Sequence, residues 1–230
     1  MPVLYQYQLC PHSRFIRLAM GELQMEAEHI ETSPFSREKS FLALNPAGTL
    51  PVLSEQDGQV VPGAEIIAEY LDETRGLVLG NRRLLPESPA DRVEVRRLML
   101  WFNTKFHTEV SDLVLVEKAH KRLFPEFFPG DAPNTNAIRA AGINIRYHLN
   151  YLAHLLARRN WLAGETLTYA DLAAAAHLSV VDYFGDVPWE TSEAAKTWYA
   201  RVKSRPAFRP LLADRLKGIL PAAHYTNLDF

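Results

Sequence analysis

The chain has 230 residues, of which 47% are hydrophobic and 23% are charged, and its formal net charge is −2. These proportions are ordinary for a globular protein with its own core, and the small net charge argues against a nucleic-acid-binding surface. The sequence has one cysteine, no apolar run of about 20 residues and no secretory signal. The expected setting is therefore the reducing cytoplasm, without membrane insertion.

Up to about residue 80 the predicted elements are short and mixed in type. Strands are predicted at residues 3–9, 27–30, 50–53 and 59–61, and helices at residues 14–21, 36–44 and 64–73. The order of these elements is βαβαββα. We expect residues 1–80 to form one α/β domain.

From residue 86 onward the sequence predicts helix after helix. Residues 90–123 form a long amphipathic stretch, and an apolar stripe over residues 138–156 predicts a second helix. The sequence from Thr168 to Asp171 resembles a capping box, which we interpret as purely structural. A further helix over residues 192–203 ends before a proline. We expect an all-helical domain over residues 86–219 and a C-terminal tail over residues 220–230.

Four stretches carry a resemblance to a known family. They are CPHSR at 10–14, NPAGTLPVL at 45–53, LAGE at 162–165 with the acidic helix start after it, and WYARVKSRP at 198–206. In this order, and across nearly the whole chain, they resemble the cytosolic glutathione transferases. The resemblance implies a thioredoxin-like N-terminal domain followed by an all-helical C-terminal domain. It does not settle the reaction, because one fold supports many functions.

In that family the residue that activates glutathione lies near the start of the first helix. Cys10 stands at this position, Pro11 follows at the first helical position, and Ser13 lies one turn further on. Amide groups and the helix dipole stabilise a thiolate at such a place. Two interpretations remain open. Either Cys10 activates glutathione or forms a mixed disulfide with it, or Cys10 is a small buried residue that does not react.

The resemblance also locates the residues that would hold glutathione. Leu50 and Pro51 match the position where a residue before a cis-proline pairs with the cysteinyl part of the ligand. At the start of the next helix, Gly63 stands where the family has an acidic residue and Ala64 where it has a hydroxyl. Glu65 is the nearest carboxylate, but its position on the helix predicts that it points elsewhere. The glutathione site is therefore predicted to be degenerate, with no cofactor bound and no metal site.

Two apolar segments suggest contact with another protein. The loop after residue 123 carries Phe124, Phe127 and Phe128, which either pack into the core or form an exposed patch that docks a partner. The chain ends in Leu228, Asp229 and Phe230, two apolar side chains around a carboxylate. This ending is either packed on its own domain or a short recognition peptide.

The degenerate glutathione site and the apolar tail together point to a smaller group within this family. The sequence is similar to bacterial glutathione-transferase-like cell-division proteins that bind the tubulin-like polymer FtsZ. That resemblance implies a non-catalytic homodimer at the division site, which binds FtsZ filaments and links the division ring to cell-wall synthesis. The alternative is an atypical glutathione transferase, or another thiol-dependent enzyme, that uses Cys10 or Ser13.

Overall fold

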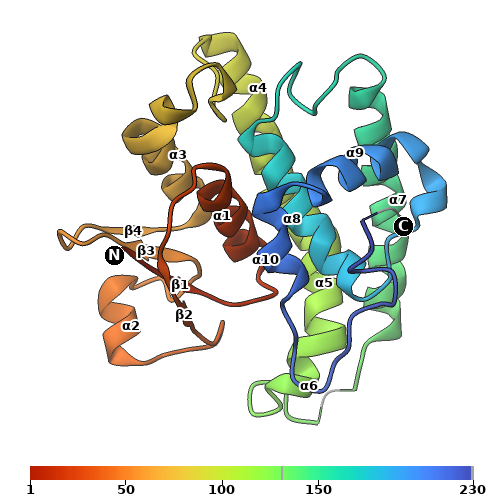
Figure 1. The fold of residues 1–230 in the computed structure, drawn as a ribbon. Coiled ribbons are helices and arrows are strands. Elements are labelled where there is room, and N and C mark those ends of the chain that lie inside the picture. The colour runs from red at the N-terminus through yellow and green to blue at the C-terminus, as the bar shows by residue number, and fades with distance from the viewer. Residues whose placement is uncertain (131, 229–230) are drawn as a thin grey trace.

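The structure is a computed structural model that describes residues 1–130 and 132–228 (Figure 1). Its N-terminal part is built on one four-stranded sheet with the strand order β2-β1-β3-β4. The strands are β1 (Val3–Gln6), β2 (Glu28–Glu31), β3 (Val52–Ser54) and β4 (Val60–Pro62). β1 pairs with β2 in parallel, whereas the pairs β1–β3 and β3–β4 are antiparallel. The mixed sheet agrees with a thioredoxin-like domain.

Three helices cover the sheet, and they follow the predicted order βαβαββα. They are α1 (Pro11–Glu22), α2 (Lys39–Leu44) and α3 (Ala64–Arg75). Successive residues of β1 face opposite sides, so Leu4 joins the core with α1 and α3 while the ring of Tyr5 lies 6.2 Å from Phe41 of α2. The predicted bounds were wrong at β1 and α1. β1 ends earlier and α1 begins earlier, because residues 7–10 form a turn.

The C-terminal part is helical throughout, as predicted. Its first elements are η1 (Gly76–Arg82), α4 (Pro89–Leu100), η2 (Trp101–Ser111), α5 (Asp112–Leu115), η3 (Val116–His120) and α6 (Lys121–Leu123). The remainder are α7 (Thr135–Leu156), α8 (Tyr169–Tyr183), η4 (Trp189–Thr191), α9 (Glu193–Lys203), η5 (Pro206–Phe208) and α10 (Arg209–Leu212). Residues 89–123 are continuously helical, which confirms the long predicted stretch. The wider π-type winding of η2 and η3 was not predicted.

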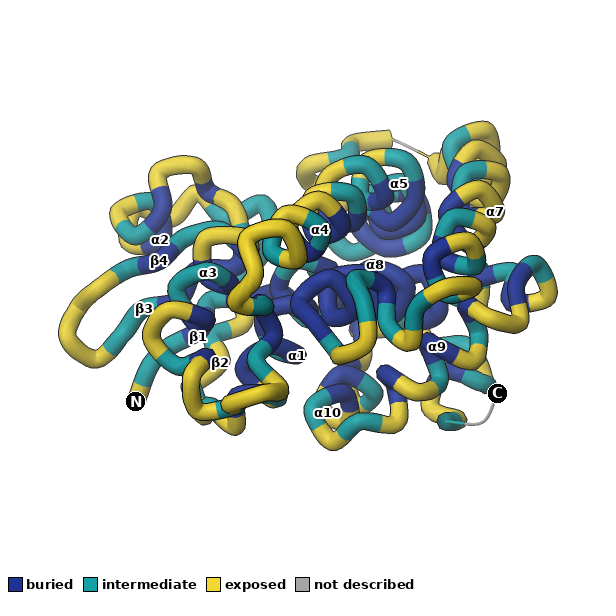
Figure 2. The backbone as a smooth tube through the Cα atoms, turned by 90° about the horizontal axis from the view of Figure 1, so that it is seen from above, coloured by how far each residue is buried: buried dark blue, intermediate teal, exposed yellow. Residues whose placement is uncertain are grey.

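Helix α8 is the centre of the molecule. Every residue of α8 is buried, and Figure 2 shows it as a dark blue run between the other helices. Its first turn is held by Asp171, whose carboxylate accepts hydrogen bonds from the backbone and hydroxyl of Thr168, from the backbone of Leu162 and from the Trp198 indole, all at 2.9–3.0 Å. The structural interpretation of this helix start is therefore confirmed. No helix in the described ranges is long and apolar enough to cross a membrane.

A buried arginine joins the two parts of the chain. Arg14 of α1 is fully buried, and its guanidinium donates to Ser179 of α8 at 2.8 Å, to Asp214 at 3.0 Å and to the Tyr225 hydroxyl at 2.5 Å. Arg17 donates twice more to Asp214, at 2.8 and 2.9 Å. We call these five residues the Arg14 cluster. The cluster ties α1, α8 and the C-terminal segment together.

Candidate functional site

The site begins where β1 gives way to α1. In the turn between them, the backbone N–H of Cys10 donates to the carbonyl of Tyr7 over 3.0 Å. Cys10 is the N-terminal cap residue of α1, with φ −66° and ψ 116°, and Pro11 takes the first helical position, where its missing N–H costs no hydrogen bond. The thiol therefore lies at the amino end of a helix, as the sequence predicts.

Cys10 is half-buried and has polar partners. Burial alone would raise the pKa of its thiol, but hydrogen bonding and charge from His12, together with hydrogen bonds from Ser13, outweigh burial and lower that pKa. For His12, burial acts to lower the pKa and the contact with Cys10 acts to raise it, and the net shift is upward. Each group thus favours the charged form of the other. The sequence alone predicted no role for His12, although it lies in the same CPHSR motif.

Ser13 lies one turn into α1 and is fully buried. Its hydroxyl accepts a hydrogen bond from the backbone N–H of Tyr7 at 3.4 Å, and it also hydrogen-bonds to the Cys10 sulfur. Ser13 is therefore placed to support Cys10 from inside the fold. Of the two candidate activating residues, Cys10 is the one with exposed surface.

Three histidines from three elements pack edge to face beside Cys10. The ring centroid of His12 lies 4.5 Å from that of His107 on η2 and 5.2 Å from that of His177 on α8. Ser111 bridges the other two, since its hydroxyl lies 3.2 Å from Nδ1 of His107 and 2.9 Å from Nδ1 of His177. Nε2 of His177 contacts the Asn103 side-chain oxygen at 3.1 Å. These residues are far apart in the sequence, and their spacing carries no signal that could have grouped them.

The start of α3 carries no polar side chain where the family holds the γ-glutamyl group. Gly63 is the cap residue with φ +90°, a backbone conformation that favours glycine, and Ala64 is buried. The Leu50–Pro51 peptide bond is cis, and the Pro51 carbonyl accepts a hydrogen bond from the Gly63 N–H at 3.0 Å. The cis-proline loop and the start of α3 are therefore arranged as the family resemblance implies. The polar side chains that would bind a γ-glutamyl group are absent at Gly63 and Ala64.

Glu65, in the first turn of α3, has a weak electrostatic effect on His12. After the larger effects of burial and of Cys10, the negative charge of Glu65 adds to the upward shift of the His12 pKa. The prediction that its carboxylate points away from the glutathione position stays a prediction. Its side chain remains exposed and reaches this imidazole through its field.

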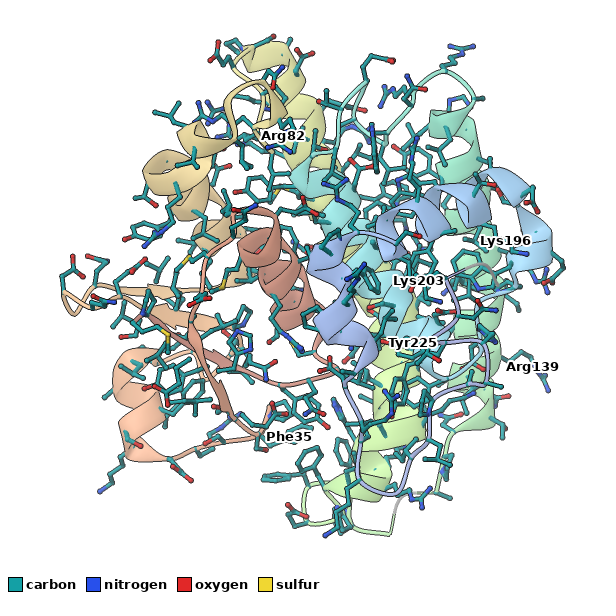
Figure 3. The ribbon with its side chains drawn as sticks, in the orientation of Figure 1. Phe35, Arg82, Arg139, Lys196, Lys203 and Tyr225 are labelled. Carbon is teal, nitrogen blue, oxygen red and sulfur yellow. The ribbon has the colours of Figure 1, made fainter. Side chains whose placement is uncertain are left out.

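The three phenylalanines of the loop after α6 pack around a fourth ring. Phe35, from the segment between β2 and α2, lies 5.1 Å from Phe124, 4.9 Å from Phe127 and 5.5 Å from Phe128 between ring centroids, and 5.3 Å from His120. We call these five residues the aromatic patch. Figure 3 shows Phe35 below the sheet, on the side of the loop that follows α6.

The loop after α6 matches neither predicted alternative completely, because it is partly packed and partly exposed. Phe124 and Phe128 are half-buried against Phe35, whereas Phe127 keeps 49% of its surface exposed. Phe35 and Phe127 also line a hollow of about 650 Å³ beside α2, with Arg37 and Glu38 at its polar rim. One ring of the loop and the adjoining hollow are therefore open to another molecule.

The C-terminal segment is anchored before it ends. After α10 it runs down to the level of α6 and turns back (Figure 1). The Tyr225 side chain is fully buried in the Arg14 cluster, and the backbone N–H of Ala222 donates to the Tyr183 carbonyl of α8 at 2.8 Å. Nε2 of His224 contacts Asp182 at 3.0 Å. Tyr225 thus fixes the segment against the helical core, close to Lys203 in Figure 3.

The predicted recognition ending lies just beyond this anchor. Leu228 is half-buried, whereas Asp229 and Phe230 lie outside the described residues. The role assigned to these three side chains therefore stays a prediction. Within the ranges that the structure covers, no group of three or more His, Cys, Asp or Glu side chains is arranged to hold a metal ion.

The chain matches two family models. The model described as glutathione S-transferase, N-terminal domain, matches residues 4–82, and that described as glutathione S-transferase, C-terminal domain, matches residues 119–215. These ranges contain Cys10 and the start of α3 in the first and α8 in the second.

Full-length relatives point to one group within the family. The chain is 46% identical over 230 residues to FtsZ-localized protein A of Caulobacter vibrioides, which covers 99% of this chain and 97% of that protein. The solved structure of FzlA from C. crescentus is 45% identical with a TM-score of 0.92 and covers 100% of this chain and 99% of that one. A glutathione S-transferase structure from Sinorhizobium meliloti is 46% identical with a TM-score of 0.96 and covers 100% of both chains. The chain belongs to the glutathione S-transferase family and, within it, to the group that includes FtsZ-localized protein A.

Proposed function

We propose that this protein is a non-catalytic member of the family that binds FtsZ filaments at the division site, in the cytoplasm, and links the division ring to cell-wall synthesis through protein contacts. The observation that carries the proposal is the 46% identity to FtsZ-localized protein A along nearly the whole of both chains. The start of α3 supports it, because a glycine and an alanine replace the side chains that would bind the γ-glutamyl group of glutathione. Losing two charge-assisted hydrogen bonds weakens a small ligand by about a hundredfold or more.

Two surfaces are candidates for the contact with FtsZ. One is the exposed ring of Phe127 with the hollow beside it, and the other is the chain ending that follows the Tyr225 anchor. An apolar side chain next to a pocket is a common anchor in protein interfaces. The anchor at Tyr225 restricts the segment that leads to this ending, which reduces the entropy lost when a partner binds there.

We also propose a homodimer. Ile66 on α3 and Val93 and Leu100 on α4 leave 60%, 64% and 60% of their surfaces exposed. The Arg96–Glu69 ion pair, with an N–O distance of 2.7 Å, links these two helices. Exposed apolar side chains on two helices that an ion pair links form a surface that a second copy of the chain can cover.

Cosedimentation with FtsZ filaments tests the main proposal. Purified protein should pellet with FtsZ assembled in GTP and saturate as its concentration rises, and it should stay in the supernatant with unassembled FtsZ. Cys10→Ala should behave like the wild type, because the proposal assigns no chemistry to the thiol. Absence of the wild-type protein from the filament pellet would remove the proposal.

The alternative function is an atypical glutathione transferase or another thiol-dependent enzyme. The lowered pKa of the Cys10 thiol favours it, because a thiolate is the reactive form. Calorimetric titration with glutathione separates the two functions. The binding proposal predicts no saturable heat at millimolar glutathione, whereas micromolar affinity with conjugation of a standard electrophile would establish the alternative.

A further inference from the structure

Strand β2 forms one margin of the sheet (Figure 1). In the strand order β2-β1-β3-β4 its only neighbour is β1, and within residues 1–130 and 132–228 no other strand pairs with its outer edge. Every residue of β2 is exposed or half-buried. An open edge of this kind presents unpaired backbone N–H and C=O groups, which another extended segment can bind.

The register of β2 on β1 identifies which backbone groups point outward. The N–H groups of Glu28 and Thr32 donate to carbonyls at or beside β1, at 2.9 and 2.8 Å, and between them the two strands pair in parallel. Successive residues of a strand direct their backbone groups to opposite edges, so Glu28, Ile30 and Thr32 face β1. His29 and Glu31 therefore direct their N–H and C=O groups to the open edge.

The hollow of about 650 Å³ adjoins this edge. Ile30 and Glu31 of β2 line it, together with Tyr5 of β1 and Phe41 and Leu44 of α2. Ile30 is the partner of Tyr5 in the register, so both side chains point to the α2 side of the sheet. A side chain beside Ile30 on an added strand would point to the same side. An apolar side chain at that position would therefore enter the hollow.

The charges along β2 favour a basic partner. Residues 26–31 contain three glutamates and no lysine or arginine, and Glu28 is exposed two residues before Ile30, so its side chain faces the same side of the sheet. A lysine or arginine two positions from the apolar residue of an added strand would lie beside Glu28, and opposite charges on neighbouring strands attract. A second copy of β2 would instead bring the same three carboxylates to the edge.

We propose that the open edge of β2 binds an extended segment of a partner protein as an additional antiparallel strand. An apolar residue of the segment enters the hollow beside Ile30, and a basic residue two positions away pairs with Glu28. His29 and Glu31 each exchange two backbone hydrogen bonds with the segment. Phe127 lines the same hollow, so its ring packs against the apolar residue of the partner.

This inference extends the proposed function, because the hollow is one of the two candidate surfaces for FtsZ. It does not depend on FtsZ as the partner, since synthetic peptides test the edge of β2 directly. Absence of the protein from the FtsZ pellet would leave the strand site standing. Absence of peptide binding would leave the chain ending as the FtsZ contact.

The first test measures binding of the peptide acetyl-TKTFTKT-amide to the wild-type protein by nuclear magnetic resonance. The peptide should shift the amide signals of His29 and Glu31 and slow their hydrogen exchange, because both N–H groups become hydrogen-bonded. N-methylation of a threonine next to the phenylalanine should abolish binding. N-methylation of the phenylalanine, whose N–H points away from β2 in this register, should not. Equal effects of the two methylations, or no binding of the unmodified peptide, would overturn the proposal.

The second test compares two substitutions at one position of the edge. His29→Pro removes an outward N–H but none of the bonds to β1, and proline is tolerated on an edge strand. It should weaken binding of the peptide about tenfold, whereas His29→Thr, which keeps the N–H, should bind it like the wild type. Equal binding by the two folded variants would overturn the proposal. A loss of dimer mass with His29→Pro would also overturn it, because the edge would then bind a second copy.

The third test concerns the basic residue of the partner. Glu28→Lys should weaken binding of acetyl-TKTFTKT-amide and strengthen binding of acetyl-TETFTET-amide, because the charge on the edge is reversed. Asp57→Lys, at an exposed carboxylate in the turn between β3 and β4, should change neither affinity by more than about twofold. Equal effects of the two charge reversals would overturn the assigned partner.

Discussion

The Arg14 cluster and the aromatic patch both connect the sheet-containing part of the chain to its helices, but they do so by different physical means. In the Arg14 cluster a fully buried guanidinium donates to Ser179, Asp214 and Tyr225. In the aromatic patch the contacts are between rings, His120 keeps an unpartnered nitrogen and Phe127 remains half exposed. A buried guanidinium such as that of Arg14, which has no unpartnered nitrogen, fixes one arrangement, whereas rings beside an open hollow can accept another molecule. We therefore expect the Arg14 cluster to stabilise the fold and the aromatic patch to bind another molecule.

Removing the central charge of the Arg14 cluster should have the largest effect. Arg14→Met should lower the free energy of unfolding by about 3 kcal/mol or more, because the Tyr225 hydroxyl loses its charged donor inside the fold. Because Arg17 still pairs with Asp214, the expected loss of free energy of unfolding lies near the lower end of the range for breaking a buried ion pair. Urea denaturation measures the change.

A matched surface pair provides the control for Arg14. Arg146 pairs with Glu190 at 3.1 Å, with 54% and 70% of their side chains exposed. Arg146→Met should change the free energy of unfolding by less than about 0.5 kcal/mol. Equal losses for the two variants would mean that the Arg14 cluster is no more important than a surface ion pair.

Acid should act on the aromatic patch through His120. Burial lowers the His120 pKa from 6.5 to about 4 in the folded protein, so between these values the unfolded chain binds more protons than the folded one. The contribution of neutral His120 to the free energy of unfolding is therefore fully present above pH 6.5 and is lost as the pH falls. At pH 4 the loss from this residue is about 3 kcal/mol. His120→Gln should remove that part of the pH dependence. Denaturation curves of both proteins over a pH series test this, and parallel curves would contradict it.

Substitutions at Phe35 and Phe127 should distinguish a role of the aromatic patch in packing from a role in binding. Phe35 contacts four other rings, so Phe35→Ala should cost about 2 kcal/mol of stability. Phe127 is 49% exposed, so Phe127→Ala should cost less than about 1 kcal/mol and yet weaken cosedimentation with FtsZ filaments. Unchanged cosedimentation by a folded Phe127→Ala protein would take this ring out of the proposed interface.

The smallest effect on stability is expected at the chain ending, beyond the Tyr225 anchor. Asp229→Lys reverses a charge without removing apolar surface and should change the free energy of unfolding by less than about 0.5 kcal/mol. It should nevertheless impair division when it is the only copy in the cell. Normal growth and division with this variant would remove Leu228, Asp229 and Phe230 from the binding site.

Much of the fold could be predicted from local sequence patterns. The order of strands and helices followed from short-range periodicity, and the hydrogen bonds between Thr168 and Asp171 followed from their spacing. The absence of polar side chains at Gly63 and Ala64 could also be predicted, because it depends only on which residues stand at the helix start. The bounds of β1 and α1 were less certain, since a turn between two apolar segments reads like a continuation of the strand.

The sequence by itself determined the cysteine at the start of α1, the missing polar side chains at the start of α3 and the apolar character of the loop after α6. Only the tertiary structure decided which groups surround the thiol. His12, His107 and His177 come from three helices. Arg14 donates a hydrogen bond to Tyr225, which lies near the other end of the chain. The physical reason is that pKa values and buried hydrogen bonds depend on distance and burial in space. Neither quantity is encoded in the spacing of residues along one segment.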